Sequence, residues 1–362
     1  MKETILIYLN SLQPSGGIER VIATLSNKLS DKYEVTILVK DESISFYKLN
    51  EYIKLMSLNN ALVLNMDHQL SRMISISMSF VKTYKLLKAF LRKNSFDHYY
   101  VAHPLNALEF HLARGIDKQT IVAEHGSQTA YNVVYRKIKK WLYPRARIYV
   151  VPTKTDTTLY ENMGLPAIYI PHFRSELDYV KAERIGKTVL TVGRFTAVKQ
   201  QMLLLSAWND IVKDKPELDW KLQIVGKGEL QTVMESYITL NHLQNRVQIL
   251  PPTKEIDVYY KNASFFVLTS SSEGFGMVLL EAISFGLPCV SFDCPSGPRD
   301  VIKNNVNGML IEQNNLTEFK IAMLKLMQDT ESLRLMGDRA YRDSFDWTDE
   351  KVIDKWHSIL TK

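Results

Sequence analysis

Residues 264–281 read SFFVLTSSSEGFGMVLLE, and this stretch decides the fold. The apolar run over 264–268 predicts a buried parallel strand. Polar residues and two glycines, Gly274 and Gly276, follow it and predict a turn, and the apolar run up to Glu281 predicts a helix. A strand, a glycine turn and a helix N-terminus together form an anion site, because free N–H groups point outward there and the helix dipole favours negative charge.

Two carboxylates, Glu273 and Glu281, bracket the turn and the first part of this helix. Their spacing is a little over two helical turns, so Glu281 can return to the side of the turn. One carboxylate near the surface of the site and one deeper in it would bind two hydroxyl-bearing parts of one phosphorylated ligand. A nucleotide-sugar is such a ligand. The spacing alone is equally compatible with a capped helix that carries two solvated glutamates.

The composition is that of a globular protein. The chain has 362 residues, of which 46% are hydrophobic and 23% charged, so we expect two domains and no extensive disorder. Cys289 and Cys294 are the only cysteines, which excludes a disulfide framework and makes a poor zinc site. The first residues, with Glu3 among them, predict a strand and not a signal peptide, and no apolar run reaches the length of a membrane span.

Strand-like runs alternate with helical ones throughout, which predicts an α/β protein with parallel sheets. The predicted strands of the first half are 4–9, 34–39, 98–102, 120–123, 148–151 and 167–170. Those of the second half are 188–192, 221–225, 247–250, 264–268, 289–292 and 309–311. Each half is large enough for one doubly wound domain, and the polar stretch between Pro171 and Lys187 predicts the boundary.

Further candidate residues follow other predicted strands. Gly16 and Gly17 stand between the first strand and a helix, where they permit close approach of backbone to a ligand. Gly193, Arg194 and Lys199 follow the first strand of the second half, and the two cations would neutralise a diphosphate. Each motif alone is also compatible with an ordinary turn or with solvated cations.

Two weaker signals complete this set. Gly226 and Gly228 form a lone glycine pair after a strand, which a structural turn explains as well as a nucleotide site does. His125 follows the strand 120–123 and would place an imidazole against a sugar hydroxyl, with His103 as its competitor.

Taken in order, these motifs resemble the retaining glycosyltransferases of family 4. The resemblance spans almost the whole chain, is strongest over 188–302, and includes a terminal Phe345-Asp-Trp347. It implies the GT-B fold, in which two Rossmann-like doubly wound domains face each other across a cleft. Residues 1–172 would form the acceptor-binding domain, 173–342 the nucleotide-sugar-binding domain, and 343–362 a helix that packs back on the first domain.

The resemblance also implies roles for residues. The catalytic set would be His125, Arg194, Lys199 and Glu273. The donor-binding set would be Gly16, Gly17, Gly193, Gly226, Gly274, Phe275, Gly276, Met277 and Glu281, with Glu281 on the ribose. Two positions depart from the family pattern, since Gln200 stands where glycine is common and His172 where many relatives have asparagine.

The expected function is retaining transfer of a hexose or N-acetylhexosamine from a nucleotide diphosphate sugar, with a UDP-sugar favoured, to a lipid-linked saccharide acceptor. The sequence motifs of the chain resemble those of bacterial capsule, exopolysaccharide or O-antigen enzymes. No Asp-x-Asp motif occurs, so we expect neither a metal nor another cofactor, and fixed cations and helix dipoles would hold the diphosphate. The alternatives are a nucleotide-sugar epimerase with the same fold and a non-catalytic scaffold subunit that binds nucleotide-sugar.

Basic segments with apolar neighbours suggest where the protein works. The surplus of positive charge lies in the first half, including 72–93 and the run Arg136 to Lys140 followed by Trp141 and Tyr143. Such segments bind anionic lipid surfaces, so we expect a cytoplasmic protein that is peripheral on the inner face of the cell membrane. Amphipathic core helices with solvated lysines are the alternative. No nucleic-acid-binding motif accompanies the basic segments, so no nucleic-acid partner is expected.

Overall fold

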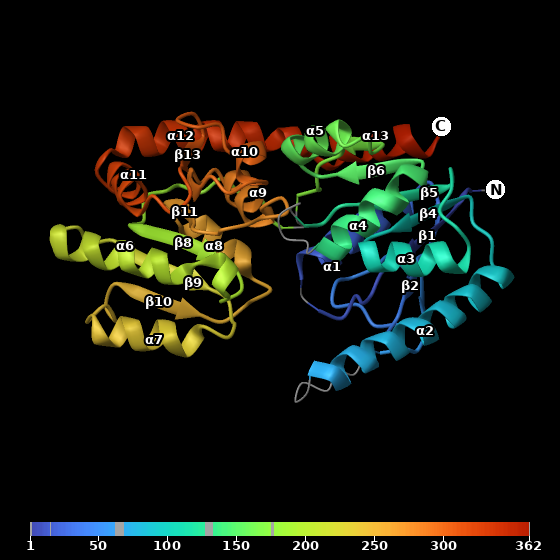
Figure 1. Cartoon of the computed structure of the whole chain (residues 1–362). Coiled ribbons are helices and arrows are strands. Elements are labelled where there is room, and N and C mark those ends of the chain that lie inside the picture. Colours follow the sequence, from blue (N-terminus) through green and yellow to red (C-terminus); the bar gives the residue numbers. More distant parts are fainter. Residues whose placement is uncertain (1, 15, 62–68, 127–132, 175–176, 362) are drawn as a thin grey trace. The chain divides into compact units, whose positions relative to one another are not determined.

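The computed structural model describes residues 2–14, 16–61, 69–126, 133–174 and 177–361, and for 69–74 and 76 only the backbone. The chain divides into two compact units, one formed by residues 1–173 with 349–362 and the other by 174–348 (Figure 1). No helix in these described ranges is long and apolar enough to cross a membrane.

The first unit is built on a seven-stranded parallel sheet with the order β3-β2-β1-β4-β5-β6-β7. Its strands are β1 (Thr4–Tyr8), β2 (Glu34–Val39), β3 (Lys54–Ser57), β4 (His98–Val101), β5 (Thr120–Ala123), β6 (Ile148–Val151) and β7 (Ala167–Tyr169). The sequence did not predict the edge strand β3, because its residues alternate between exposed and half-buried and form no apolar run.

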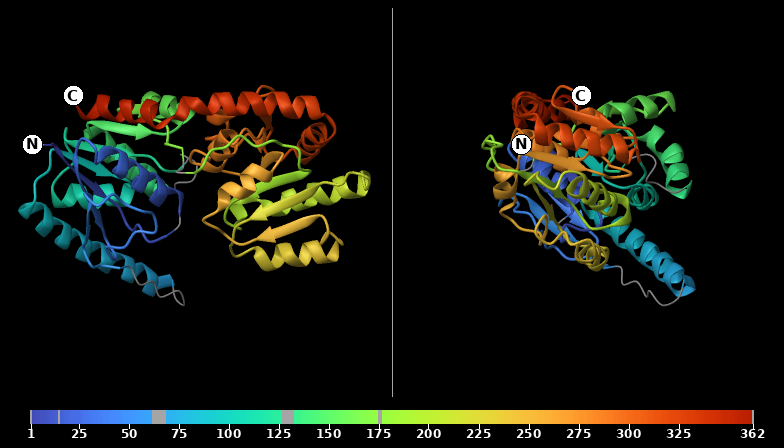
Figure 2. Two further views of the ribbon diagram at one scale, coloured as in Figure 1. Left: turned by 180° about the vertical axis from the view of Figure 1, so that it is seen from behind. Right: turned by 90° about the vertical axis from the view of Figure 1, so that its left-hand side faces the viewer.

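Helices cover both faces of this sheet. They are α1 (Gly17–Leu29), α2 (Gln69–Lys93), α3 (Pro104–Ala113), α4 (Val133–Leu142), α5 (Lys154–Asn162) and α13 (Asp349–Leu360). Apolar residues of α1 and α13 pack on one face of the sheet, and those of α2, α3, α4 and α5 pack on the other. Figure 2 shows α13, in red, running beside this sheet. The C-terminal helix therefore completes the core of the first unit.

The second unit is built on a six-stranded sheet with the order β10-β9-β8-β11-β12-β13, also parallel. Its strands are β8 (Thr188–Val192), β9 (Lys221–Val225), β10 (Val247–Leu250), β11 (Phe265–Leu268), β12 (Cys289–Phe292) and β13 (Gly308–Ile311). All six lie within one residue of their predicted bounds. Together the two sheets confirm the predicted pair of Rossmann-like domains.

The helices of the second unit again form two layers. They are α6 (Gln201–Asp214), α7 (Gln231–Leu240), α8 (Ile256–Asn262), α9 (Met277–Ser284), α10 (Pro298–Val301), α11 (Leu316–Gln328) and α12 (Thr330–Asp343). Residues of α6, α7, α11 and α12 pack on one face of the sheet, and those of α8, α9 and α10 on the other. Short 3-10 turns occur in this unit at η3 (Ala197–Lys199) and η4 (Ser344–Trp347), and in the first unit at η2 (Tyr143–Arg145).

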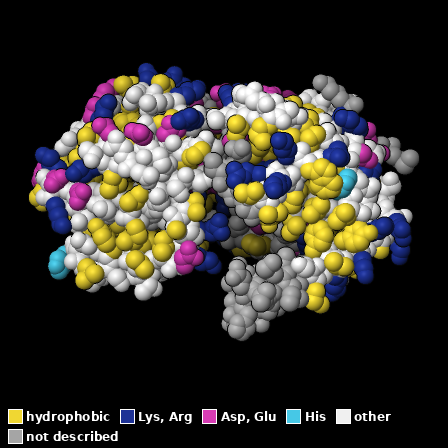
Figure 3. All heavy atoms as spheres, viewed as in Figure 1, with side chains coloured by type: hydrophobic (Ala, Val, Ile, Leu, Met, Phe, Trp, Pro, Cys, Tyr) yellow, Lys and Arg dark blue, Asp and Glu magenta, His cyan; other side chains and the backbone are white. Residues whose placement is uncertain are grey.

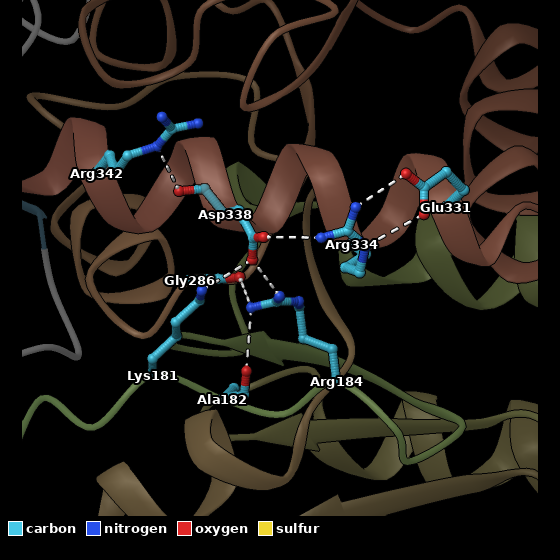
Figure 4. A network of polar contacts seen from close by, with 8 residues as sticks. All are labelled: Lys181, Ala182, Arg184, Gly286, Glu331, Arg334, Asp338 and Arg342. Atoms are coloured by element: carbon cyan, nitrogen blue, oxygen red, sulfur yellow. Dashed lines mark hydrogen bonds and ion pairs between the residues drawn. The ribbon is translucent and has the colours of Figure 1, made fainter.

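The segment that leads into β8 is held to the body of the second unit by charges (Figure 4). Asp338 on α12 accepts Lys181 Nζ at 2.9 Å and Arg184 Nη2 at 2.6 Å. Arg184 also donates to the carbonyl of Gly286 at 3.1 Å, just after α9. Burial alone would raise the pKa of the Asp338 carboxyl, but Lys181 and Arg184 outweigh it and lower that pKa. The segment is thus anchored within the second unit.

Candidate active site

The predicted site residues of the second unit follow three neighbouring strands. Gly193 and Arg194 follow β8, Gly226 follows β9, and Glu273 follows β11, and the sheet order places β8 between the other two. In a parallel sheet these carboxyl ends share one edge, where ligands bind in open α/β folds. The loops that carry these residues therefore meet at one place.

The glycines of this edge permit two loops to interlock. A Cβ atom added to Gly226 would lie 2.0 Å from the carbonyl oxygen of Gly193, and one added to Gly228 would lie 2.4 Å from that of Phe195. The N–H of Phe195 donates to the carbonyl of Lys227 at 2.9 Å, which closes the contact. Gly226 and Gly228 are thus required by backbone packing, which fixes the loop that carries Arg194.

The two cationic side chains that are predicted to bind the diphosphate, Lys199 and Arg194, differ in their surroundings. Lys199 Nζ donates to Glu273 Oε1 at 2.6 Å, and the Glu273 side chain is only 9% exposed. Arg194 is exposed, and its guanidinium has no hydrogen bond or ion pair within the described part of the chain. A cation and a carboxylate from separate loops are therefore already joined, while the second cation stays available.

Gln200 explains how the loop after Lys199 keeps a glycine-like shape. This residue has φ 51° and ψ 36°, a left-handed conformation that favours glycine. The Thr269 hydroxyl donates to the carbonyls of Lys199 and Gln200 at 3.0 and 3.1 Å. Gln200 thus holds a conformation that glycine adopts readily, and a non-glycine residue there costs about 1 kcal/mol or more.

The glycine turn over 273–276 leads into the N-terminus of α9. Gly276 precedes the helix with φ 85°, and its carbonyl accepts the N–H of Leu279 at 2.8 Å. The N–H groups of Met277 and Val278 have no backbone acceptor within the described residues. The neighbouring loop supports this turn, because the buried Ser296 hydroxyl donates to the carbonyls of Glu273 and Gly274 at 3.2 and 3.4 Å. A Cβ on Gly297 would lie 2.7 Å from the carbonyl oxygen of Phe275.

Ser296 and Gly297 were not identified from the sequence as supports of the turn. Their signal was present in the run CPSGP over 294–298, whose proline and glycine content indicates a tight loop.

Glu281 lies deep in the second unit. It is 2% exposed, and the Tyr260 hydroxyl donates to its Oε2 at 2.8 Å. Since Glu273 is 8% exposed, both carboxylates of the motif are buried. Ribose hydroxyls would have to reach Glu281 through this packing, so its role on the ribose stays a prediction.

The first unit holds the remaining predicted residues. Gly16 precedes α1 and Gly17 is its first residue, so both stand at a helix N-terminus. A Cβ added to Gly17 would meet nothing within 4 Å, whereas Gly16 lies close to the flexible side chain of Glu19. Gly17 thus keeps an exposed backbone, as close approach of a ligand requires.

Glu124 fixes the backbone that carries His125. Its Oε1 accepts the N–H groups of His125 and Gly126 at 3.0 and 3.1 Å. Its Oε2 accepts Lys139 Nζ, the Tyr149 hydroxyl and, at 2.9 Å, the Tyr160 hydroxyl. Burial alone would raise the pKa of Glu124, but Lys139 and these hydrogen bonds outweigh it, so its pKa is lowered and the carboxylate stays charged.

His125 is a neutral imidazole at pH 7. Burial lowers its pKa to about 4, and the Tyr100 hydroxyl lies 3.0 Å from its Nε2. The His172 ring stacks on it with centroids 5.8 Å apart, and burial lowers the pKa of His172 to about 3. His125 therefore cannot supply a cation at neutral pH and is suited to a hydrogen bond.

Within the described residues no group of three or more His, Cys, Asp or Glu side chains has an arrangement that could hold a metal ion. Cys289 and Cys294 are free and buried.

Comparison with known proteins identifies the chain. The model of Glycosyltransferase Family 4 matches residues 15–173, and the model of Glycosyl transferases group 1 matches residues 180–343. The two matches lie side by side along most of the chain, so the chain belongs to the glycosyltransferases.

This glycosyltransferase has bacterial relatives along its full length. It is 27% identical to the amylovoran biosynthesis glycosyltransferase of Erwinia amylovora, over 98% of this chain and 99% of the relative. It is 24% identical to the Campylobacter jejuni enzyme named GalNAc-α-(1→4)-GalNAc-α-(1→3)-diNAcBac-PP-undecaprenol α-1,4-N-acetyl-D-galactosaminyltransferase, over 96% of each chain.

Solved structures share the fold of this glycosyltransferase. Sucrose-phosphate synthase from Thermosynechococcus elongatus matches with a TM-score of 0.84 at 16% identity, over 99% of this chain and 98% of that one. Anabaena HepE in complex with UDP and glucose matches with a TM-score of 0.73 at 16% identity, over 99% of each chain. The predicted GT-B fold is thereby confirmed.

Proposed function

We propose that the protein transfers a hexose or N-acetylhexosamine from a UDP-sugar to a lipid-linked saccharide, with retention at the anomeric carbon, in the synthesis of a bacterial surface polysaccharide such as capsule or O-antigen. The amylovoran and undecaprenol-linked names of its relatives support the polysaccharide and the acceptor. The fold shared with a protein solved with UDP and glucose supports the donor.

One observation carries this proposal. In the second unit an available guanidinium, an ammonium paired with a buried carboxylate, and the N-terminus of α9 occur together at the carboxyl edge of one sheet. Cations and free amides recognise a diphosphate, and a buried carboxylate recognises hydroxyl groups. A diphosphate joined to a sugar offers both kinds of group.

The same groups favour departure of the nucleotide diphosphate. As the bond to the sugar breaks, negative charge grows on the phosphate, and Arg194, Lys199 and the amides near Gly276 and Met277 stabilise it more than the ground state. This needs no metal ion or other cofactor. Positive charge grows on the sugar ring, and attack of the acceptor hydroxyl on the same face, with its proton passing to the leaving phosphate, retains the configuration.

Binding of the donor would rearrange the Lys199–Glu273 ion pair. A diphosphate that approaches Lys199 competes with Glu273 for the ammonium, and this releases an oxygen of Glu273 for a sugar hydroxyl. Binding of one molecule thus satisfies both partners of the pair, whereas a nucleotide without the sugar would leave the buried carboxylate with a weakened partner.

The proposed location is the inner face of the cell membrane. On α4, Val133, Val134 and Trp141 are 57%, 61% and 49% exposed, and Arg136, Lys137 and Lys140 are exposed beside them. Figure 3 shows hydrophobic and basic side chains intermixed on this face of the first unit. Exposed apolar and cationic groups on one helix suit an anionic lipid surface.

Part of the predicted membrane segment has another role. Lys139, Leu142 and Tyr143 are buried, and Lys139 is paired with Glu124, so these three residues do not face a lipid surface. The first residues of the predicted segment 72–93 lie outside the described side chains. Sedimentation with anionic liposomes tests the remaining surface, and binding that persists after Trp141→Ser with Lys137→Ser would contradict it.

Transfer activity tests the chemical proposal. We expect Arg194→Ala and Glu273→Gln each to lower kcat by about 10²-fold or more, as loss of charge-stabilising groups does. Lys221→Ala, at the amino end of β9 and thus at the opposite edge of the sheet, is the matched control and should keep full activity. Activity near wild type in both site variants would reject these roles.

NMR of the product decides whether the configuration at the anomeric carbon is retained. Activity that stops when EDTA is added would reject the proposed independence from metal ions.

A further inference from the structure

The backbone and the ring of His125 are held by two different residues. Glu124 accepts the N–H groups of His125 and Gly126, which fixes the backbone. The ring is contacted from the neighbouring strand β4, where the Tyr100 hydroxyl lies 3.0 Å from His125 Nε2. The orientation of the imidazole therefore depends on Tyr100, a residue that the sequence did not single out.

Burial determines how many protons this pair carries at pH 7. Tyr100 is 3% exposed, and burial raises the pKa of its hydroxyl, so the hydroxyl keeps its proton. Burial lowers the pKa of His125 to about 4, so its ring carries one proton and not two. One ring nitrogen of His125 is therefore a donor and the other an acceptor.

The ring proton of His125 can lie on either nitrogen, and the two forms leave different numbers of buried groups without a partner. Within the described residues the Tyr100 hydroxyl has no hydrogen-bond partner besides His125 Nε2, and His125 Nδ1 is buried and has none. With the ring proton on Nε2, the Tyr100 O–H and Nδ1 would both lack a partner. With Tyr100 donating to Nε2, the proton lies on Nδ1, and this N–H alone lacks one. Because an unmet buried polar group costs free energy, the second form is favoured.

Packing alone does not select this form. The His172 ring stacks on that of His125 with centroids 5.8 Å apart, which sets the plane of the imidazole and not the position of its proton. A cavity of the first unit also borders the ring, with Tyr100, His172 and Trp356 of α13 among its lining residues. The hydrogen bond from Tyr100 is thus the contact that distinguishes the two nitrogens.

Tyr100 itself is firmly placed. Its ring lies 5.8 Å from that of Trp356, measured between centroids, and both residues are buried in the same apolar core. The C-terminal helix α13 therefore supports the tyrosine from one side, and the tyrosine orients the histidine on the other.

We propose that Tyr100 is a positioning residue that holds His125 in the form protonated on Nδ1, so that His125 offers a hydrogen-bond donor to an oxygen of the transferred sugar. The inference rests on the proposed function, since a sugar must be present to accept this hydrogen bond. A hydroxyl oxygen of a sugar has lone pairs for the Nδ1–H, and accepting it satisfies the group that the fold leaves unmet. Tyr100 acts only through His125.

NMR of the full chain with ¹⁵N-labelled histidine tests the tautomer, because protonated and unprotonated ring nitrogens differ strongly in ¹⁵N chemical shift. The chain has eight histidines, and the signals of His125 are those absent from His125→Gln. At pH 7 we expect the proton on Nδ1 in the wild type and a mixture of both forms in Tyr100→Phe. A wild-type ring protonated on Nε2, or an unchanged tautomer in Tyr100→Phe, refutes the proposal.

Tyr33→Phe is the matched control for this experiment. It removes a tyrosine hydroxyl from the same apolar core, but Tyr33 precedes β2 and so lies at the opposite edge of the sheet. This variant should keep the wild-type tautomer of His125 and full activity. A tautomer that changes as much in Tyr33→Phe as in Tyr100→Phe would mean that the core and not the hydrogen bond is responsible, and this would also refute the proposal.

Turnover of donor separates a positioning role from a merely structural one. We measure release of UDP from UDP-glucose, UDP-galactose and their N-acetylated forms, and expect Tyr100→Phe to lower kcat about 10-fold, as loss of one oriented hydrogen bond does. In the His125→Gln background the same change should lower kcat no further, because Tyr100 acts through the histidine. Additive losses refute the positioning role. Failure of the wild type to use any of these donors refutes the proposed function, while the tautomer measurement still decides the hold of Tyr100 on the ring.

Discussion

In the first unit Glu124 is 2% exposed and collects Lys139, two tyrosine hydroxyls and two backbone N–H groups, whereas in the second unit Arg194 is exposed and its loop is held by backbone contacts at Gly226. Both edges are preorganised, but by different means. Buried charge pairs fix the first edge, so its charged groups are already paired with each other within the fold. Close backbone packing fixes the second edge, so the guanidinium of Arg194 remains available for a ligand, although Lys199 is paired with Glu273.

Loss of Lys139 tests the charge-based edge and has the largest expected effect. Lys139→Met leaves the Glu124 carboxylate buried without its cation, which should lower the free energy of unfolding by about 3–5 kcal/mol. Lys140→Met, on the exposed side of the same helix, should change it by less than about 0.5 kcal/mol. Urea unfolding measures both, and equal effects would contradict the structural role of the pair.

Acid should weaken the first unit before the second. The pKa of His103 and His125 is lowered to about 4 and that of His172 to about 3, chiefly by burial, from an ordinary value of 6.5. Between pH 6.5 and 4 the unfolded chain therefore binds more protons, so stability falls as pH falls, by up to about 1.4 kcal/mol per pH unit for each group.

Hydrogen exchange at pH 7 and pH 5 separates the two units in this experiment. The second unit contains one histidine, the exposed His242, and should keep its protection. Earlier loss of protection in the second unit would overturn the assignment, and His242→Gln should leave both profiles unchanged.

Gly226→Ala tests the backbone-based edge. Its methyl group would meet the Gly193 carbonyl oxygen at 2.0 Å, so the two loops must separate, at a cost of about 1–3 kcal/mol and with weaker donor binding through the displaced Arg194. Gly17→Ala, whose methyl group meets nothing within 4 Å, should stay within about 1 kcal/mol of wild type in stability. Calorimetry with and without UDP-glucose measures both quantities, and wild-type behaviour of Gly226→Ala would show that the loops do not interlock.

Gln200 gives the smallest expected effect. Gln200→Gly removes the cost of a left-handed backbone and should stabilise the protein by up to about 1 kcal/mol, while Gln200→Val should destabilise it by about 1–2 kcal/mol. Thermal unfolding at one pH ranks the three chains. An order with valine above glycine would mean that the loop does not hold this conformation.

The sequence predicted the second unit better than the first because its signals are local. Gly193 and Gly226 each follow an apolar strand directly, and the stretch 264–281 contains one. A strand buried on both faces has a sequence that forms one apolar run. The edge strand β3 has no such run and was missed. The sequence also did not show why position 226 requires glycine, because its close contact is with the carbonyl of Gly193, 33 positions earlier.

The polar networks of the first unit have no motif. Tyr8, Asn10, Lys40 and Glu109 are spread over 101 positions, and only the strand order brings them together. Lys139 is a clearer case, because it lies in a basic run that predicts a solvated or lipid-facing surface, yet its place on the inner side of α4 directs it to Glu124. A residue's charge is visible in the sequence, but the side of a short helix on which it is used depends on tertiary packing.

The placement of α13 affects the order in which the chain can fold during synthesis. Val352, Trp356, Ile359 and Leu360 cover apolar residues of a sheet whose strands were all made before position 170. Every residue of the second unit leaves the ribosome before these four do, so the second unit can fold first. Until α13 has been made, the earlier-made sheet keeps one apolar face incompletely covered, and such transiently exposed apolar surface favours aggregation.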